Sequence, residues 1–239
     1  MQIDTIGETG STNADLAARL ANGEPLAEGY WLVADRQTAG RGRQGRQWLD
    51  TPGNFMGSTL VELLAGDPPA MQLSMVAALA LLETVLQRLP DPSRVRLKWP
   101  NDVLLDGAKF CGILLERVKD HAVIGMGVNL VAAPSIDGRE TRSLSALGPA
   151  PQRDAFAREL AAAFASEVTR WRSHGGDDLR SRWQAAAHPL GTPLSVHDEH
   201  GTAVAGRFAG LAEDGALILR LDDGSQRVIH AGDVTEEKA

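Results

Sequence analysis

The stretch TAGRGRQGRQW, residues 38–48, separates two classes of fold. Gly40, Gly42 and Gly45 have the spacing G-x-G-x-x-G, which marks the phosphate-binding turn of doubly wound dinucleotide-binding folds. Such a turn follows a strand and opens a helix. A strand-like segment precedes this stretch, but the residues after it contain Pro52 and show no apolar period of a helix. The sequence therefore argues against a dinucleotide-binding fold.

The same spacing occurs in the phosphate-covering loop of protein kinases, but their V-A-I-K and H-R-D motifs are absent here. Glycine and arginine together still favour an anion site. Glycine lets the backbone approach a ligand closely, and the planar guanidinium of arginine suits carboxylate and phosphate. Within eleven residues of a chain with net charge −7 lie Arg36, Arg41, Arg43 and Arg46. This pattern indicates a loop that closes over an anion, or else a solvated charged loop.

Composition limits the class of protein. The chain has 239 residues, 43% of them apolar and 23% charged, which fits one large domain or one domain with a small companion. The negative net charge does not favour DNA or RNA as a partner. Cys111 is the only cysteine, which fits a reducing cytoplasm. The sequence shows no signal peptide, and its most apolar stretch, residues 70–89, carries polar residues. We therefore expect a cytoplasmic protein without a membrane-spanning segment.

Helix-like and strand-like segments alternate up to residue 188. The turn Asp106-Gly107 is a strong signal for a β-hairpin within residues 102–118. Other strands are predicted at 30–36, 54–63, 94–97 and 121–130, and helices at 11–23, 70–89, 152–172 and 177–187.

The composition changes at residues 188–193, HPLGTP. Short alternating strands separated by glycine turns follow, a pattern typical of a small β-barrel. We predict two domains, residues 1–188 and 189–239. The four strands predicted in the second are 194–197, 203–211, 216–221 and 226–231.

Three further features could belong to a site or to the structure alone. KWPND, residues 98–102, has the chemistry of a turn, but it would also place Lys98, Asn101 and Asp102 beside a pocket. The second feature is Lys109 with Gly112. Lys109 follows a hairpin turn, where lysine is usually solvated. Gly112 interrupts an apolar strand, as glycine does where a ligand or another backbone comes close.

The third feature is GMGVN, residues 125–129, with two glycines in one strand. A flat ligand or tight helix packing would compensate for their low strand propensity. Cys111 lies in an apolar run without a neighbouring histidine, the six histidines lack metal-ligand spacing, and no G-x-S-x-G elbow is present. The sequence therefore offers no protein nucleophile.

Taken in order, four motifs resemble those of biotin protein ligases, also called biotin–[acetyl-CoA-carboxylase] ligases. They are STN (11–13), QTAGRGRQGRQW (37–48), KWPNDVLL…KFCGILLE (98–116) and GMGVN (125–129). Each fragment alone is weak evidence, whereas their order and approximate spacing together are specific. The resemblance covers roughly residues 8–131, and the C-terminal strands fit the small last domain of that family.

The resemblance implies an α+β fold. It consists of a mixed β-sheet flanked by helices, related to the core of class II aminoacyl-tRNA synthetases, and a small C-terminal SH3-like β-barrel. Some members of the family carry an N-terminal DNA-binding domain and act as repressors. STN begins here at residue 11, so we expect the ligase-only form. A biotin-sensing corepressor without ligase activity would need such a DNA-binding domain.

The resemblance also implies roles for individual residues. Lys109 and Arg43 would be catalytic, because they would neutralise charge where the biotin carboxylate meets the α-phosphate. Trp48 would stack on adenine. Gln44 and Gln47 stand where relatives often have basic residues, which lowers the charge of the loop. Biotin would contact Ser11, Thr12, Asn13, Gln37, Gly40, Arg41, Gly42, Arg43, Lys109 and Gly112, and ATP would contact Arg43, Arg46, Trp48, Asn101, Asp102 and Asn129.

The implied reaction has two steps, formation of biotinyl-5′-AMP from biotin and ATP, and transfer of biotin to a lysine of a carrier protein. Mg²⁺ would bridge the phosphates, with no protein ligands assigned. The partner would be the biotin carboxyl carrier domain of a carboxylase such as acetyl-CoA carboxylase, and the enzyme would be a monomer or homodimer. Lipoate ligases and octanoyltransferases share the fold and remain the alternative, and a bare nucleotide-binding module is a third interpretation.

Overall fold

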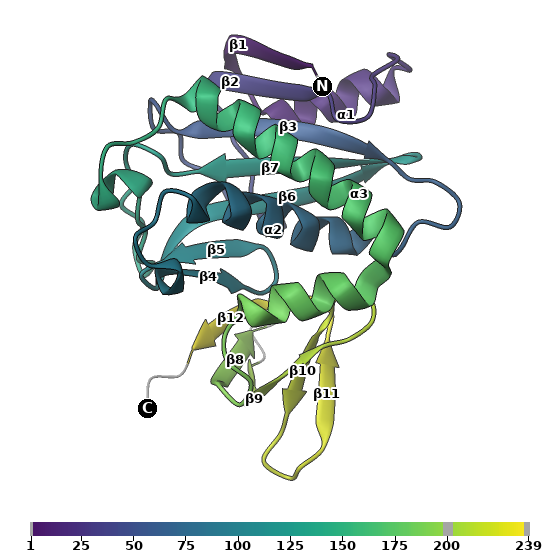
Figure 1. Cartoon of the computed structure of the whole chain (residues 1–239), viewed down its shortest axis with the longest axis vertical. Coiled ribbons are helices and arrows are strands. Elements are labelled where there is room, and N and C mark those ends of the chain that lie inside the picture. Colours follow the sequence, from purple (N-terminus) through teal and green to yellow (C-terminus); the bar gives the residue numbers. More distant parts are fainter. Residues whose placement is uncertain (1, 198–202, 237–239) are drawn as a thin grey trace.

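Seven strands form the larger of two sheets in the computed structural model, which describes residues 2–197 and 203–236 (Figure 1). Their order is β1-β2-β3-β7-β6-β5-β4. β1 and β2 are parallel and every other neighbouring pair is antiparallel, so the predicted mixed sheet is confirmed. The strands are β1 (Ile3–Thr9), β2 (Trp31–Gln37), β3 (Phe55–Glu62), β4 (Val95–Lys98), β5 (Asp102–Leu105), β6 (Ala108–Val118) and β7 (His121–Val128).

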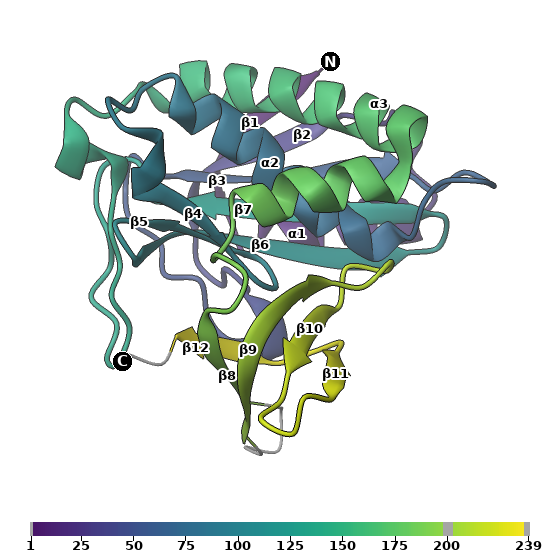
Figure 2. The same ribbon diagram turned by 60° about the horizontal axis from the view of Figure 1, so that its bottom comes forward.

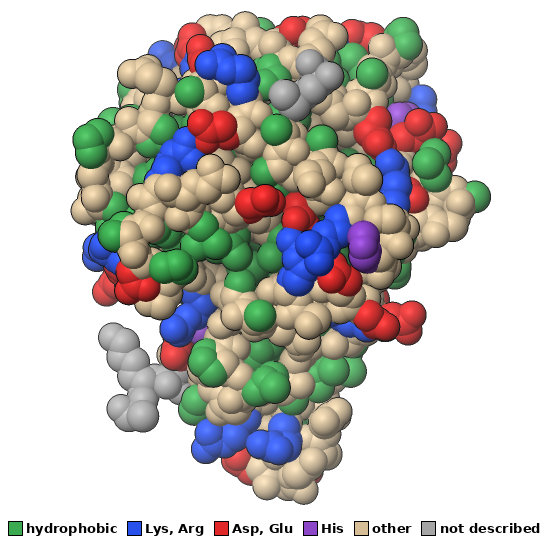
Figure 3. Space-filling view, viewed as in Figure 1, with side chains coloured by type: hydrophobic (Ala, Val, Ile, Leu, Met, Phe, Trp, Pro, Cys, Tyr) green, Lys and Arg blue, Asp and Glu red, His purple; other side chains and the backbone are tan. Residues whose placement is uncertain are grey.

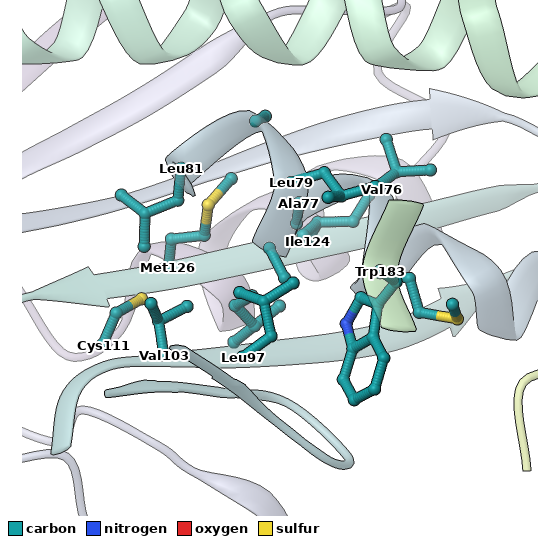
Figure 4. Packing of buried hydrophobic residues seen from close by; sticks show 14 of the residues in the cluster. Val76, Ala77, Leu79, Leu81, Leu97, Val103, Cys111, Ile124, Met126 and Trp183 are labelled. Carbon is teal, nitrogen blue, oxygen red and sulfur yellow. The ribbon is translucent and has the colours of Figure 1, made fainter. Parts of the chain in front are cut away.

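Helices cover both faces of this sheet. α1 (Thr12–Ala21) lies on one face, while α2 (Leu73–Leu86) and α3 (Arg153–Ala185) lie on the other (Figure 2). Alternation along the strands supplies both cores. On β7, Ile124 packs under α2 and α3, whereas Val123 packs under α1. Figure 4 shows the first of these cores between α2 and the strands.

α2 confirms the predicted buried helix, although it begins at Leu73 after a short 3₁₀ turn, Ala70–Gln72. It lies between the sheet and α3, which explains why apolar residues surround it on all sides. Among the described residues, no helix combines the length and the apolar character that crossing a membrane requires.

α3 corresponds to the two helices predicted over residues 152–172 and 177–187. The chain bends between them at Gly175, where φ is +75°, a backbone conformation that glycine adopts most easily. The bend lets both halves of α3 face the core, with Trp171 and Trp183 buried. The charged side chains on the outer face of α3 and its surroundings are of both signs and lie close to one another (Figure 3).

The smaller sheet is antiparallel throughout, in the order β11-β10-β9-β8-β12. The four strands predicted after residue 193 are present within this sheet, and the turn predicted at 198–201 lies outside the described residues. Its strands are β8 (Pro193–His197), β9 (Ala203–Leu211), β10 (Leu217–Arg220), β11 (Gln226–Ile229) and β12 (Asp233–Glu236).

The two sheets are joined by hydrogen bonds to the β9–β10 turn. Trp99 Nε1 donates to Gly215 O at 3.1 Å, and Gln72 Nε2 donates to Glu213 O at 2.7 Å. Gln72 is 1% exposed and also accepts from Trp171 Nε1 at 2.9 Å, so both ends of its buried amide are paired. The division into 1–188 and 189–239 stays a prediction.

Two strands were not predicted. β1 has mostly half-buried or exposed side chains and includes Gly7, so its pattern lacks the apolar face of a core strand. β12 has four residues, only one of them buried. β1 pairs with β2 and β12 pairs with β8, both across long intervening segments. Local sequence patterns do not encode pairing between such distant strands.

Candidate functional site

A floor of glycines lies on the α1 face of the large sheet. Gly125 and Gly127 are two residues apart on β7, so both face the same way. Gly127 is directly opposite Gly112 of β6, and Gly125 is opposite Ser58 of β3. Without side chains, these positions leave a flat surface on which a planar group can lie.

The N-terminus of α1 places a polar cluster at one end of this floor. Ser11 is the N-cap of α1 and accepts from Ala14 N at 3.5 Å. Thr12 N and Oγ1 donate to Gln37 Oε1 at 2.8 and 3.1 Å. Thr12 Oγ1 lies 2.7 Å from Ser58 Oγ, and a hydroxyl has one proton, so Ser58 is the donor in that pair.

Asn13 extends the cluster toward the glycines. Its Nδ2 donates to Glu116, while its Oδ1 lies against Gly125 and is buried without a partner among the described residues. An unpaired buried acceptor of this kind is costly in a folded protein. A ligand N–H that entered the cavity here would satisfy it.

A half-buried ion pair stands at the other end. Lys109 Nζ donates to Asp102 Oδ1 at 2.6 Å, and each side chain is 16% exposed. A β-bulge in the β5–β6 hairpin, at Val103 and Leu104, sets the position of Lys109. The hairpin itself forms at Asp106-Gly107 as predicted, with φ of +50° and +79°.

Residues 40–48, here called the arginine loop, cross above the floor. The loop is closed on itself, since Trp48 N donates to Gly40 O at 2.9 Å and Gly42 N donates to Arg46 O at 2.7 Å. Arg43 reaches outward to Asn101 Oδ1 at 3.4 Å. As the sequence indicated, the loop opens no helix beyond a single 3₁₀ turn, Arg43–Gly45.

The indole of Trp48 rests on the glycine floor. A Cβ added to Gly127 would lie 2.3 Å from Trp48 Cε2, and one added to Gly112 would lie 3.0 Å from Trp48 Cζ3. The group that lies against these two glycines in this structure is therefore the Trp48 side chain of the same protein. Lys109 Nζ lies 5.9 Å from the centre of the Trp48 ring.

These elements enclose a cavity of about 660 Å³, a size typical of small-molecule sites. Gly40 is the exception among the predicted site residues, because it lies buried at the base of the loop behind Trp48. Asn129 reaches the wall, but it is 1% exposed and its amide also pairs with Arg142 O and Asn54. The predicted residues that line the cavity are Ser11, Thr12, Asn13, Gln37, Arg41, Gly42, Arg43, Arg46, Trp48, Asn101, Asp102, Lys109, Gly112 and Asn129.

Burial alters the charges of the site. It lowers the pKa of the Arg43 guanidinium, although the nearby carboxylates Asp233 and Asp102 oppose this. It also lowers the pKa of the Lys98 amine, which lies in the cavity wall. Burial raises the pKa of the Cys111 thiol, which agrees with the prediction that this residue is no nucleophile.

The sequence did not indicate several parts of the wall. Ser58 lies on a strand whose pattern signals only burial. The segment 134–141 pairs beside Lys109 through Thr141 and contributes Ile136 and Arg139. Asp233 comes from β12, a strand that was not predicted. Within 2–197 and 203–236, no three His, Cys, Asp or Glu side chains group as metal ligands.

The cavity therefore has two chemically different ends. Hydroxyl and amide groups at the α1 end can bind a neutral polar ring, and Lys109 with Arg43 at the other end can bind anions. The flat floor joins them.

Comparison with protein families gives two matches. Residues 9–129 match the Biotin/lipoate A/B protein ligase family, and residues 190–235 match the Biotin protein ligase C terminal domain.

Relatives extend over nearly the whole chain. A biotin–[acetyl-CoA-carboxylase] ligase of Paracoccus denitrificans is 39% identical, over 96% of this chain and 98% of that protein. One of Mycobacterium tuberculosis is 36% identical, over 98% and 88%. Among solved structures, the biotin protein ligase of Aquifex aeolicus in complex with biotin and ATP has the same fold, with a TM-score of 0.85 at 24% identity, covering 100% of this chain and 99% of that one.

Proposed function

Since the chain belongs to the biotin/lipoate A/B protein ligase family, we propose that it is a biotin–[acetyl-CoA-carboxylase] ligase. It makes biotinyl-5′-AMP from biotin and ATP and transfers biotin to a lysine of a biotin carboxyl carrier domain. The observation that carries this proposal is the convergence of nearly all the motif residues on one cavity with a polar end and a cationic end. The partner is the carrier domain of a carboxylase, as the names of the relatives indicate.

In the first step, an oxygen of the biotin carboxylate attacks the α-phosphorus of ATP, and pyrophosphate leaves with the electron pair. Two anions must meet, so their repulsion is the main barrier. Lys109 and Arg43 offset that repulsion with fixed positive charge in a site largely shielded from water. Preorganised charge of this kind accounts for much of the rate enhancement in many enzymes.

In the second step, the neutral amine of the carrier lysine attacks the acyl carbon, and AMP leaves. The attacking nitrogen loses a proton. Both nucleophiles come from substrates, which explains a site without a serine or cysteine nucleophile. Until the carrier arrives, the arginine loop keeps the mixed anhydride away from water.

Binding roles follow from the two ends of the cavity. Ser11, Thr12, Asn13 and Gln37 bind the ureido ring of biotin, which offers both N–H donors and a carbonyl acceptor. In this proposal the N–H groups of the ureido ring donate to the acceptors of this cluster, and its carbonyl accepts from the donors. Gly40, Arg41 and Gly42 shape the loop above it, and Gly112 forms the floor.

The nucleotide takes the cationic end. Arg43 and Arg46 face the phosphates, Trp48 offers a flat surface for adenine, and Asn129 stands in the wall nearby. Asn101 and Asp102 lie beside the phosphates. Asp102 is the residue that would hold Mg²⁺ together with the substrate phosphates, because this ion needs few protein ligands. When bound, the ion neutralises phosphate charge.

We also propose that the seven-stranded sheet with its helices is a core of the class II synthetase type, and that the five-stranded sheet is an SH3-like barrel. The protein acts in the cytoplasm as a monomer or homodimer. The single cysteine, buried and reduced, supports that compartment.

Lipoate ligase or octanoyltransferase activity is the alternative, and the polar cluster counts against it. The dithiolane of lipoate has neither N–H nor carbonyl groups, so Asn13 Oδ1 would stay unpaired when that ring entered. Sites built to hydrogen-bond a substrate discriminate strongly against analogues that lack the group.

Intact-mass spectrometry tests the proposal. The protein is incubated with ATP, Mg²⁺, a recombinant biotin carboxyl carrier domain, and either biotin or lipoate. We expect one biotinyl group on the carrier, none on a carrier whose acceptor lysine is replaced by glutamine, and no lipoylation at equal concentration. Lipoylation in preference to biotinylation, or no modification at all, would refute the assignment.

A further inference from the structure

We propose that Asp233, on β12 of the small sheet, is a positioning residue for the reaction, because its carboxylate holds Arg46 and so keeps the arginine loop closed over the cavity. Arg46 Nη2 donates to Asp233 Oδ2 at 2.5 Å. This inference rests on the proposed function, and it gives the small sheet a part in positioning the arginine loop.

The arginine loop has few other external restraints. Its backbone hydrogen bonds close it on itself, and Gln44 Oε1 accepts from Arg46 Nη2 at 2.5 Å within the loop. In the described part of the chain, the polar contacts of the loop with the rest of the protein are Arg43 to Asn101 at 3.4 Å and Arg46 to Asp233. The Asp233 contact is the shorter of the two and joins opposite charges.

Asp233 can act as an anchor because its sheet is fixed to the large one. β12 pairs with β8 in register, with Asp233 opposite His197. The β9–β10 turn of the same sheet accepts hydrogen bonds from Trp99 and Gln72. Leu211 N, at the start of that turn, also donates to Gln184 Oε1 of α3 at 3.0 Å. A carboxylate on this sheet therefore has a set position relative to the cavity.

The charges around Asp233 agree with this role. Burial raises the pKa of its carboxyl, but the hydrogen bond from Arg46 and the charges of Arg46, Arg139 and Arg43 outweigh burial, so the pKa lies below its usual value. The carboxylate is therefore ionised at neutral pH. Arg43, one of the proposed catalytic residues, is thereby held near Asn101 and Asp102 rather than in solvent.

The alternative is that the contact between Arg46 and Asp233 holds the arginines away from the substrates. The geometry favours closure, because in this same conformation Arg41, Arg43 and Arg46 line the cavity and Trp48 lies on its floor. The two interpretations predict opposite effects on ATP binding. If Asp233 holds the loop closed, loss of Asp233 weakens ATP binding. If Asp233 instead holds the arginines away from the substrates, its loss strengthens ATP binding.

A double-mutant cycle tests the inference. Asp233→Asn, Arg46→Gln and the double variant are compared in ATP–pyrophosphate exchange with biotin. Asp222→Asn, which changes an exposed carboxylate in the β10–β11 turn, is the control. We expect Asp233→Asn to raise the KM for ATP by up to about fivefold, as for loss of a partly exposed ion pair. Arg46→Gln should raise it more, because Arg46 also faces the phosphates in the proposed function. We expect kcat to change less and the double variant to resemble Arg46→Gln, because Asp233 acts only through Arg46.

A second readout needs no substrate. Amide hydrogen exchange of residues 40–48 in the ligand-free protein should rise in Asp233→Asn and stay at the wild-type rate in Asp222→Asn, with equal melting temperatures. Additive effects on KM, an unchanged or lower KM, or unchanged exchange would overturn the inference. An inactive wild-type protein would refute the proposed function instead, and the exchange experiment would still decide whether Asp233 holds the loop.

Discussion

Gly112 and Gly127 face one another across β6 and β7, and at the scale of single residues the absence of a side chain creates the site. A glycine in a strand interior weakens the strand, so its presence needs a compensating contact. Here the indole of Trp48 provides it.

Gly127→Ala should therefore impair the enzyme more than it impairs the fold. The new methyl group would lie 2.3–2.6 Å from three ring atoms of Trp48, so the indole and the arginine loop must shift. A shift of roughly 1 Å near a reacting centre costs about 100-fold in rate. We expect kcat/KM in biotin-dependent exchange to fall by about that factor. Gly7→Ala, whose added Cβ meets nothing within 4 Å, is the matched control, and equal activities of the two variants would contradict the prediction.

Lys109→Met should remove most adenylate formation. The substitution keeps much of the side-chain volume and deletes the charge that pairs with Asp102 and, in the proposed reaction, neutralises the α-phosphate. We expect biotin-dependent ATP–pyrophosphate exchange to fall about 10²–10³-fold, as for removal of one preorganised donor. Lys119→Met, outside the cavity, controls for loss of a lysine. Exchange within a factor of a few of wild type would remove Lys109 from the catalytic role.

At the scale of elements, turns, bulges and bends determine where the long regular segments and their side chains lie. The β5–β6 hairpin places Lys109 because its turn and bulge are both fixed. α3 covers the sheet along two directions because it bends at Gly175. Both features depend on positive φ, which glycine supplies at the smallest cost.

Gly175→Ala should destabilise the protein without affecting the site chemistry. Gly175 has φ +75° and ψ −175°, a conformation almost restricted to glycine, so alanine there costs roughly 1–3 kcal/mol. A chain of this size loses about 2–4 °C of melting temperature for each kcal/mol. Urea and thermal unfolding measure the change. Gly7→Ala again serves as the control, since its φ is not positive and the added methyl meets open space. A Gly175→Ala protein as stable as wild type would show that the bend has another origin.

At the scale of the whole molecule, the junction between the two sheets holds a buried titratable group. His188 is 5% exposed, and neither ring nitrogen has a hydrogen-bond partner among the described atoms. Burial lowers the pKa of its imidazole, and the charges of Arg96 and Lys98 on β4 add to this, while Glu236 on β12 opposes it. The ring is therefore neutral in the folded protein near pH 7.

Stability should consequently decline on the acidic side. An unfolded histidine takes up a proton near pH 6.5, whereas folded His188 does so only at lower pH, so the unfolded state binds more protons in that range. The contribution of His188 is present above about pH 6.5 and is lost as the pH falls toward its folded pKa. We expect the difference in unfolding free energy between wild type and His188→Gln to shrink between about pH 7.5 and pH 5. A constant or growing difference would contradict the depressed pKa.

Much of the fold could be predicted because it is encoded locally. Short apolar runs marked β2 and β3, the Asp106-Gly107 turn marked the β5–β6 hairpin, and a long apolar run marked α2. The same local logic placed Gly125 and Gly127 on one face, and order along the chain was enough to associate the four motifs. β1 and β12 were not predicted, because short strands with few buried side chains carry no distinctive period.

What the sequence by itself determined is therefore the set of chemical groups and the elements that carry them, including the glycines, the arginine loop, Asp102 and Lys109. Only the tertiary structure decided which of them meet. It put Ser58 beside Thr12, laid Trp48 on the glycine floor, and brought Asp233 to Arg46 across 187 positions of the chain. Periodicity reports how a segment is buried, whereas contacts between distant segments arise from the packing of whole elements, which no local pattern contains.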